Sequence, residues 1–443
     1  MSAKNPQCVA FDYGINSLRE QVVFSQTSGG IKFAALNKPL QSDLVQMNLS
    51  FKFGSLSALQ NQSTAGAMAG AVVQRGTSAS SRQQIRCELL RLGVVVSMGF
   101  NETGGTAMVT AKNAAWKSAL DFVAHLLKDS NFPEEEFEEI RSARIKAVEG
   151  QIRDKSAQAD NAWSRYGNQY AKGDPRYRYT LEETLQELKA VTRNQASTFF
   201  RQFYGAQNAQ VTLLGPIDAQ EIQQALASLL DGWRAPEPWQ RIERPLTEMP
   251  PARLVFDTPG RTVVALRAFN RLPVSSMGMD SDYLALVVAS RIFGGGPGSR
   301  MWVRLREANG PRHTVSAGLN ASPYERSGSI FLHAEVAHQN VAVAEQALRE
   351  ELARSLIAGF AAAEVETFKR QILADRLRGR CGDGWAMSFM SSELEFAQAT
   401  DATAQRDALI ASFTPRHINA VWRQYLRPHQ LVWGVFGDLA KVR

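Results

Sequence analysis

The stretch Thr192–Gly215, TRNQASTFFRQFYGAQNAQVTLLG, returns 222 residues later as Thr414–Gly437, TPRHINAVWRQYLRPHQLVWGVFG. The copies align without a gap. Each predicts a helix that begins at a capping threonine, followed by a short apolar strand that ends at a glycine. Repeats of about 20–50 residues indicate solenoids, whereas an offset of half the chain indicates two copies of a whole domain. We therefore expect two similar domains, with function where they face each other.

The pattern around the two copies predicts the composition of each domain. Residues 45–53 alternate between apolar and polar side chains, which is typical of a strand covered on one side. Helical periodicity alternates with such strands in both halves, and residues 231–252 are rich in proline. We predict an α+β chain with a first domain at 1–230, a linker at 231–252 and a second domain at 253–443. Each domain should be an antiparallel-rich mixed sheet packed with helices.

Composition excludes several classes of function. The formal net charge is +7, but lysine and arginine form no block with interleaved aromatics, so nucleic-acid binding is not predicted. No apolar run reaches 18 residues, which predicts a soluble chain without a membrane span. The three cysteines include no CxxC pair, which argues against a disulfide framework and a thiolate zinc site. The sequence leaves open whether the protein is periplasmic or cytoplasmic.

The glycine run at 294–298 is followed by Ser299 and Arg300 and superficially resembles a phosphate-binding loop. It lacks the GxxxxGK[ST] spacing and follows a predicted helix instead of a strand. We expect it to turn the chain tightly into a helix that begins near Ser299.

A family resemblance rests on two segments. Residues 294–322, GGGPGSRMWVRLREANGPRHTVSAGLNAS, resemble the GGG-x-x-SR-hydrophobic-x-x-x-RE-x-x-G-L-x-Y segment of the pitrilysin-type metallopeptidases, family M16. Residues 171–188, AKGDPRYRYTLEETLQEL, also have a counterpart there, and the resemblance is strongest to the zinc-less second half or subunit of bacterial members. It implies the LuxS/M16-like metallohydrolase fold, with paired homologous α+β domains.

The same resemblance implies that the zinc site is lost. Active members carry an HxxEH helix, in which two histidines bind zinc and the glutamate acts as general base. The family's KGT segment corresponds to residues 75–77, which places HxxEH at residues 67–71. The degenerate positions are Ala67, Gly70 and Ala71, none of which can bind a metal. Glu149 lies near the position of the distal glutamate ligand, and we interpret it as part of a solvated helix face. We expect no metal or cofactor in this chain, and zinc in a partner.

Another group of metal-binding residue types lies at His333, Glu335 and His338. On a strand, His333 and Glu335 would share a face and His338 would lie opposite. Because zinc-binding histidine pairs of this family need helical spacing, we interpret these as ordinary strand and turn residues.

Two further features bear on substrate binding. In active relatives an arginine, and a tyrosine seven residues later, donate hydrogen bonds to the substrate and the tetrahedral intermediate. Arg306 matches the arginine, but His313 replaces the tyrosine, and an imidazole is shorter and has a pH-dependent charge. The strand at 45–53 is either a peptide-pairing edge strand or an ordinary sheet strand, and we favour the latter.

Three functions remain open at this stage. The first is a non-zinc-binding half or subunit that pairs with an HxxEH-bearing homologue, as a heterodimer or as part of a longer chain. Together they would form a closed proteolytic chamber and bind a peptide substrate. The second is a structural core-type protein with no role in proteolysis, which the change from tyrosine to His313 favours. The third, an autonomous metallopeptidase, is disfavoured by the missing histidines.

Overall fold

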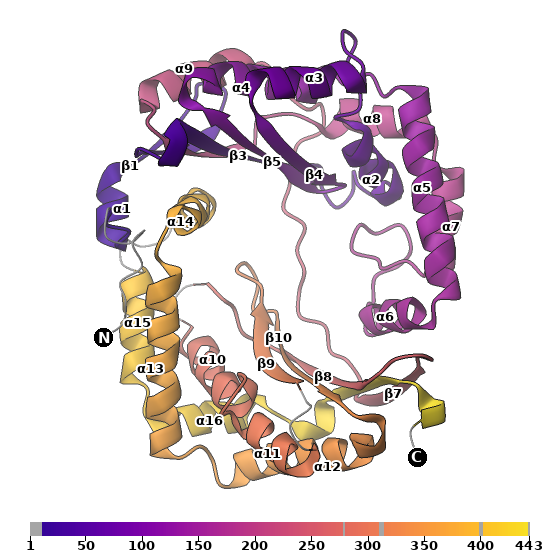
Figure 1. The fold of residues 1–443 in the computed structure, drawn as a ribbon, viewed down its shortest axis with the longest axis vertical. Helices are drawn as coiled ribbons and strands as arrows, with labels where there is room; N and C mark the ends of the chain where they lie inside the picture. The colour runs from indigo at the N-terminus through magenta and orange to yellow at the C-terminus, as the bar shows by residue number, and fades with distance from the viewer. Residues whose placement is uncertain (1–10, 278–279, 310–313, 398–401, 442–443) are drawn as a thin grey trace. The chain divides into compact units, whose positions relative to one another are not determined.

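The computed structural model describes residues 11–277, 280–309, 314–397 and 402–441 (Figure 1). The chain divides into two compact units, each of which contains one sheet. Unit 1 combines segments 1–149, 170–242 and 380–400, and unit 2 combines segments 150–169, 243–379 and 401–443. No helix among the described residues is long and apolar enough to cross a membrane.

The sheet of unit 1 has the strand order β1-β2-β6-β3-β5-β4. Its strands are β1 (Val22–Gln26), β2 (Lys32–Asn37), β3 (Leu44–Lys52), β4 (Val95–Asn101), β5 (Gly104–Lys112) and β6 (Gln210–Gly215). Only the β2–β6 pair is parallel, and the other pairs are antiparallel.

The sheet of unit 2 has the order β7-β11-β8-β10-β9. Its strands are β7 (Ala252–Asp257), β8 (Val264–Leu272), β9 (Thr314–Ala321), β10 (Gly328–Val336) and β11 (Val432–Gly437). Here too a single pair, β7–β11, is parallel. The prediction of an α+β chain with antiparallel-rich mixed sheets is therefore confirmed.

Helices pack against both sheets. Those in the first half of the chain are α1 (Ile15–Gln21), α2 (Ser63–Val72), α3 (Arg82–Leu92), α4 (Trp116–Lys128), α5 (Glu134–Arg153), α6 (Lys155–Arg165), α7 (Leu181–Ala190), α8 (Arg193–Phe203) and α9 (Ala219–Leu230). Those in the second half are α10 (Ser281–Gly294), α11 (Arg300–Asn309), α12 (Val341–Ile357), α13 (Ala362–Gly379), α14 (Asp383–Phe396), α15 (Ala402–Ser412) and α16 (Pro415–Tyr425).

The repeated sequence segments occupy equivalent places in the two sheets. Thr192 caps α8 by accepting a hydrogen bond from the Gln195 N–H, and Thr414 caps α16 in the same way with His417. The strands that follow, β6 and β11, each lie between one parallel and one antiparallel neighbour. The two sheets therefore share their connectivity, except that β1 has no counterpart in unit 2.

Each unit includes a helix from the opposite half of the sequence. The second-half helix α14 packs on β2 and β6 of unit 1, and the first-half helix α6 packs on β7 and β11 of unit 2. Because β2 and β6 correspond to β7 and β11, the exchange is reciprocal. Periodicity alone does not show which sheet a helix will cover, so the predicted boundaries at 1–230 and 253–443 describe the repeats of the sequence and not the compact units.

Two smaller features complete the fold. Residues 233–251, within the predicted linker, form neither helix nor strand. Cys381, which lies just before α14, is disulfide-bonded, whereas Cys87 is free and exposed. The sequence argued against a disulfide framework, and one bridge does not make such a framework.

Candidate functional site

Helix α2 carries the positions that the sequence predicts to correspond to HxxEH, and at Gly70, the predicted position of the glutamate, it is packed too closely for a longer side chain without movement of its neighbours. Ala67, Gly70 and Ala71 lie at i, i+3 and i+4 on one side of this helix. A Cβ atom added at Gly70 would lie 2.5 Å from the backbone oxygen of Phe100. Since real side chains do not tolerate that distance to a backbone atom, a glutamate at position 70 would require β4 to move.

A buried cation also lies against this helix. The Nη1 of Arg144, on α5, donates a hydrogen bond to the backbone oxygen of Ala67 at 3.2 Å. Burial lowers the pKa of this guanidinium below its ordinary value. A positive charge at the first degenerate position opposes the binding of a divalent cation there. Sequence reasoning missed Arg144; the only available signal was its position on the helix expected to supply the distal glutamate.

Aromatic side chains fill the space beside α2. Tyr204 stacks on Phe53 with ring centroids 4.2 Å apart and lies 5.4 Å from Phe100, while Phe199 contacts the Gly66 side of the helix. Tyr204 is completely buried, its hydroxyl has no hydrogen-bond partner among the described residues, and burial strongly raises its pKa. The region is apolar and filled by side chains.

The other residues considered as metal ligands do not converge on one site. Glu149 forms a half-exposed ion pair with Lys189, at 3.5 Å, which fits the prediction of a solvated helix face. His333 and Glu335 share a face of β10 with 3.9 Å between Nε2 and Oε1, whereas His338 lies beyond the strand end in a short 3-10 helix. No group of three or more histidine, cysteine or carboxylate side chains in the described part of the chain could hold a metal ion.

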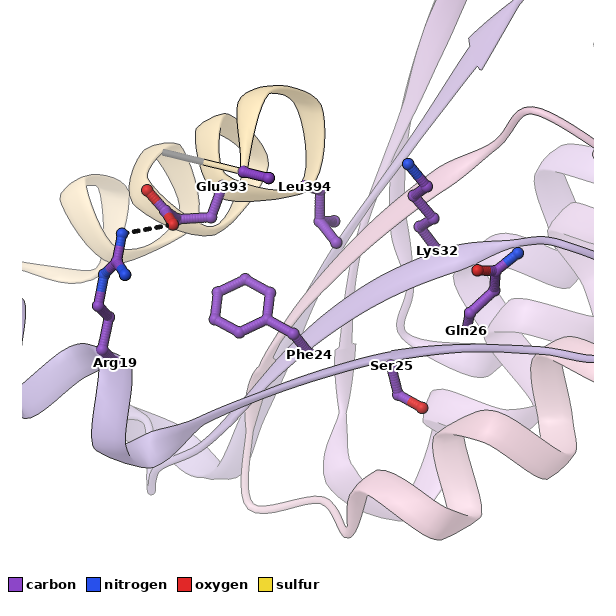
Figure 2. A pocket seen from close by; sticks show the side chains of 8 residues that line it. Arg19, Phe24, Ser25, Gln26, Lys32, Glu393 and Leu394 are labelled. Atoms are coloured by element: carbon purple, nitrogen blue, oxygen red, sulfur yellow. Dashed lines mark hydrogen bonds and ion pairs between the residues drawn. The ribbon is translucent and has the colours of Figure 1, made fainter. Parts of the chain in front are cut away.

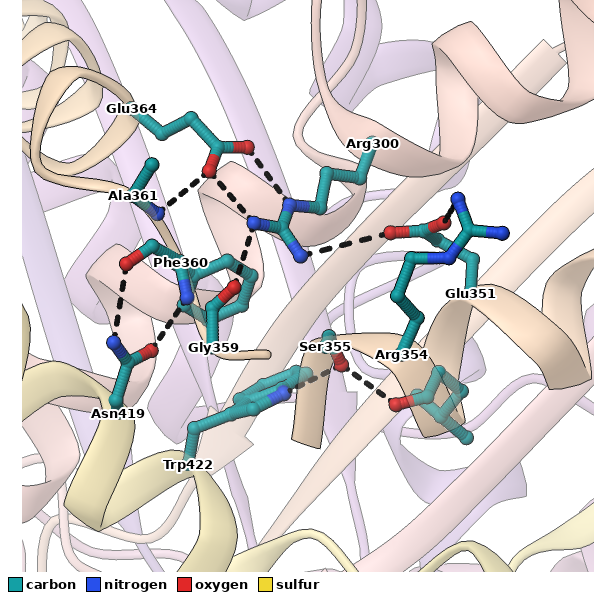
Figure 3. Close-up of polar contacts among 11 residues, drawn as sticks. Arg300, Glu351, Arg354, Ser355, Gly359, Phe360, Ala361, Glu364, Asn419 and Trp422 are labelled. Atoms are coloured by element: carbon teal, nitrogen blue, oxygen red, sulfur yellow. Dashed lines mark hydrogen bonds and ion pairs between the residues drawn. The ribbon is translucent and has the colours of Figure 1, made fainter. Parts of the chain in front are cut away.

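Helix α11 carries Arg306, and its start is fixed by a network of polar contacts (Figure 3). Arg300 donates to both carboxylate oxygens of Glu364 and to the Gly359 carbonyl, each at 2.7 Å. Arg300 also lies 3.7 Å from Glu351. Gly296 and Gly298 both have positive φ, so the glycine run forms the predicted tight turn into α11. This network ties the first turn of α11 to α12 and α13.

Arg306 differs from the other arginines of its helix. Arg304 pairs with Glu350 at 2.8 Å, and Arg300 with Glu364. Arg306 is exposed, and its guanidinium lies over the Trp302 ring, 5.2 Å from the centroid. No ion pair of Arg306 is present among the described side chains. His313 lies outside the described residues.

The alternating strand at 45–53 is an interior strand. Strand β3 pairs with β5 on one side and β6 on the other. Both sets of its backbone groups are therefore used, and it cannot accept a peptide as an added strand. The interpretation as an ordinary sheet strand is confirmed, and the peptide-pairing alternative is wrong.

Comparisons with known proteins agree with this geometry. A family model described as the peptidase M16 inactive domain matches residues 190–372. An uncharacterized zinc protease of Rickettsia bellii is 22% identical over 348 residues, which cover 76% of this chain and 79% of that protein. Residues 190–372 are therefore similar to the M16 inactive domain. Helix α2 lies outside the matched range.

Solved M16 structures share the fold. The M16 inactive domain from Pseudomonas fluorescens has a TM-score of 0.77 at 17% identity, with 94% of this chain and 97% of that chain covered. The first half of the periplasmic protease PqqL from Escherichia coli also has a TM-score of 0.77, at 16% identity, with coverages of 96% and 93%. Against the longer PqqL structure, 94% of this chain covers only 45% of that chain.

Proposed function

We propose that this chain is the non-zinc-binding half or subunit of an M16-type zinc metallopeptidase. It pairs with an HxxEH-bearing homologue, encoded separately or as another part of a longer chain, and the two enclose a chamber that binds peptide substrate. The observation that carries the proposal is the contrast between α2, which has no ligands and is filled in, and Arg306, which remains exposed. The match to half of PqqL supports a pairing of halves.

In this proposal the zinc and the general base belong to the partner. Arg306 donates hydrogen bonds to the substrate backbone and to the negative charge that develops on the tetrahedral intermediate. His313 is a second donor in place of the family's tyrosine, and its contribution depends on pH because imidazole titrates near neutrality. Arg300 does not touch substrate; it positions α11 through Glu364 and Glu351.

Two observations support a periplasmic location as part of this proposal. PqqL is a periplasmic protease, and Cys381 is disulfide-bonded. Because disulfides persist in oxidising compartments, we assign the protein to the periplasm.

A structural core-type role is the second candidate, favoured by the replacement of the family's tyrosine with His313. In that case the chain would join a large assembly without binding peptide.

The two candidates are separated by co-expression of this chain with an HxxEH-bearing M16 homologue encoded beside it. Cleavage of a fluorogenic peptide by the purified complex is measured for the wild type and for Arg306→Ala. Removal of one transition-state donor is expected to lower kcat by about 100-fold. Arg304→Ala is the matched control, because Arg304 lies on the same helix but pairs with Glu350. Equal activity of the two variants would refute the role of Arg306, and a stable complex without cleavage would favour the structural role.

A further inference from the structure

Strand β1 is an edge strand of the unit 1 sheet, at the opposite edge from β4, and it has no counterpart in unit 2. Among residues 11–277, 280–309, 314–397 and 402–441 it pairs only with β2. The Thr27 N–H donates to the Ile31 oxygen, so the alternation of an antiparallel ladder directs the backbone groups of Phe24 and Gln26 away from β2. The Gln26 oxygen accepts a bond from Gln223. The N–H and C=O of Phe24 make no hydrogen bond within the described part of the chain.

The sequence of β1 does not protect this edge. Natural edge strands avoid pairing with other chains by means of charges, prolines or bulges. The strand reads VVFSQ, without charge or proline, and Val23 and Phe24 are 47% and 41% exposed. The edge strand β7 of the unit 2 sheet, which corresponds to β2, carries Arg253, which is paired with Glu345, and ends at Asp257.

An open groove of about 700 Å³ runs along β1, between this strand and the end of α14 (Figure 2). Phe24 and Leu394 provide an apolar surface within it. Arg19 and Glu393 neutralise each other through an ion pair of 2.7 Å. Lys32 lies in the same groove on β2, exposed, and its ammonium makes no ion pair or hydrogen bond within the described part of the chain. The groove therefore combines free edge amides, an apolar surface and one uncompensated positive charge.

We propose that this groove binds an extended, acidic peptide segment of another protein, which adds to β1 as a further strand. The backbone of the segment pairs with Phe24, an apolar side chain packs against Phe24 and Leu394, and a carboxylate pairs with Lys32. Main-chain pairing supplies the affinity, while the groove and Lys32 select the sequence. The inference rests on β1 and its groove alone and requires neither Arg306 nor a zinc-bearing partner.

The test uses the full chain without a partner and a fluorescein-labelled peptide of about ten residues in which valine and threonine alternate around a central glutamate. Binding is followed by fluorescence anisotropy. The same peptide with lysine in place of glutamate is expected to bind about fivefold more weakly. A version with N-methylated amides, which cannot pair with a strand edge, is expected not to bind. Equal binding of all three peptides, or of none, overturns the proposal.

Variants assign the binding to the groove. Lys32→Glu should reverse the preference, so that the lysine peptide binds better than the glutamate peptide. Lys146→Glu, a change of the same charge on the exposed face of α5, should leave the preference as it is. Phe24→Pro removes the outward N–H and the apolar side chain and should abolish binding while circular dichroism stays native. An unchanged preference in Lys32→Glu would contradict the proposal. So would concentration-dependent dimers that Phe24→Pro dissolves, since the occupant of the edge would then be a second copy of this chain.

Discussion

The two exchanged helices, α14 and α6, cover equivalent strands of the two sheets but are held there by different interactions. Helix α14 is held in unit 1 by an apolar contact with the sheet and by three ion pairs, with α1, the end of β2 and β3: Arg19–Glu393, Lys38–Asp383 and Lys52–Glu395. Helix α6 is held on the unit 2 sheet by one aromatic side chain and by an ion pair in which Asp160 lies 2.7 Å from Arg267 of β8. Trp163 lies edge-on to Phe269 and Phe436, with ring centroids 5.2 and 5.6 Å away. Equivalent positions in two related sheets therefore constrain where a helix docks but not which interactions hold it.

The aromatic contact is the easier one to break. Gly434 leaves room for Trp163, since a Cβ there would lie 2.6 Å from the indole ring. Trp163→Ala should destabilise unit 2 by about 3 kcal/mol, because the cavity is apolar and the ring contacts are lost. Hydrogen exchange should show reduced protection of β7 and β11. Trp163→Phe is the control and should lose less than half as much. Equal loss of protection in the unit 1 sheet would contradict the assignment of α6 to unit 2.

The ionic contact should respond to charge and salt instead. The combined variant Asp383→Asn, Glu393→Gln and Glu395→Gln leaves three cations beside α14 without a carboxylate partner. We expect a loss of about 2 kcal/mol, seen as faster exchange of the α14 amides. In the wild type, about 1 M NaCl should weaken protection of α14 more than that of α6, since salt screens charges and not aromatic contacts, and α6 combines the Arg267–Asp160 ion pair with its aromatic contacts. Glu20→Gln, an exposed change on the neighbouring α1, is the control. An equal loss of protection in α14 and α6 at high salt would contradict the proposed difference between their contacts.

The smallest expected effect is on the pH dependence of the free energy of unfolding. Burial acts to raise the pKa of Glu345, but hydrogen bonds from Arg253 and Arg349 lower it below its ordinary 4.5. The stability that Glu345 gives to unit 2 is therefore present above pH 4.5 and is lost as pH falls from there through the lower folded pKa. Burial raises the pKa of Glu393 on α14, although Arg19 acts to lower it. The ionisation of Glu393 therefore lowers the stability of unit 1 as pH rises, which is opposite to the effect of Glu345 on unit 2.

The measurement is the urea midpoint of each unit against pH, followed by hydrogen exchange. Glu345→Gln should reduce the acid-induced loss of unfolding free energy in unit 2. The reduction should be only a few tenths of a kcal/mol, because solvent screens the pair with the half-exposed Arg253. If the variant and the wild type lose stability in parallel, Glu345 does not report on this contact.

Much of the fold could be predicted from local patterns. The repeated segments predicted β6 and β11, and the apolar alternation at 45–53 predicted β3. Capping residues placed the starts of α8 and α16. Strand β1 was missed, because five residues without regular alternation do not stand out from a loop. The exchange of α6 and α14 was also missed, because it depends on the path of the chain and not on any single segment.

The candidate site was predictable in chemistry but not in packing. The absence of ligands at positions 67, 70 and 71 could be read directly. The approach of Phe100 to Gly70 and the contact of Arg144 with Ala67 could not, since these residues are far apart in the sequence and meet only through the sheet. Arg306 was found through its motif, while its lack of an ion pair required the positions of Glu350 and Glu364.

The exchanged helix α14 has a consequence for the order of events during synthesis. Strand β6 ends at Gly215, whereas α14 ends at Phe396, so the ribosome must add segment 243–379 of unit 2 before α14 can cover the unit 1 sheet. At about 5–20 residues per second this interval is roughly 10–40 s. Throughout it, the apolar side chains of Ala34, Leu36 and Leu214 that later contact α14 are exposed on the nascent chain. The first unit to be translated is therefore among the last parts to be finished, and a chain truncated before α14 would keep a permanently uncovered sheet.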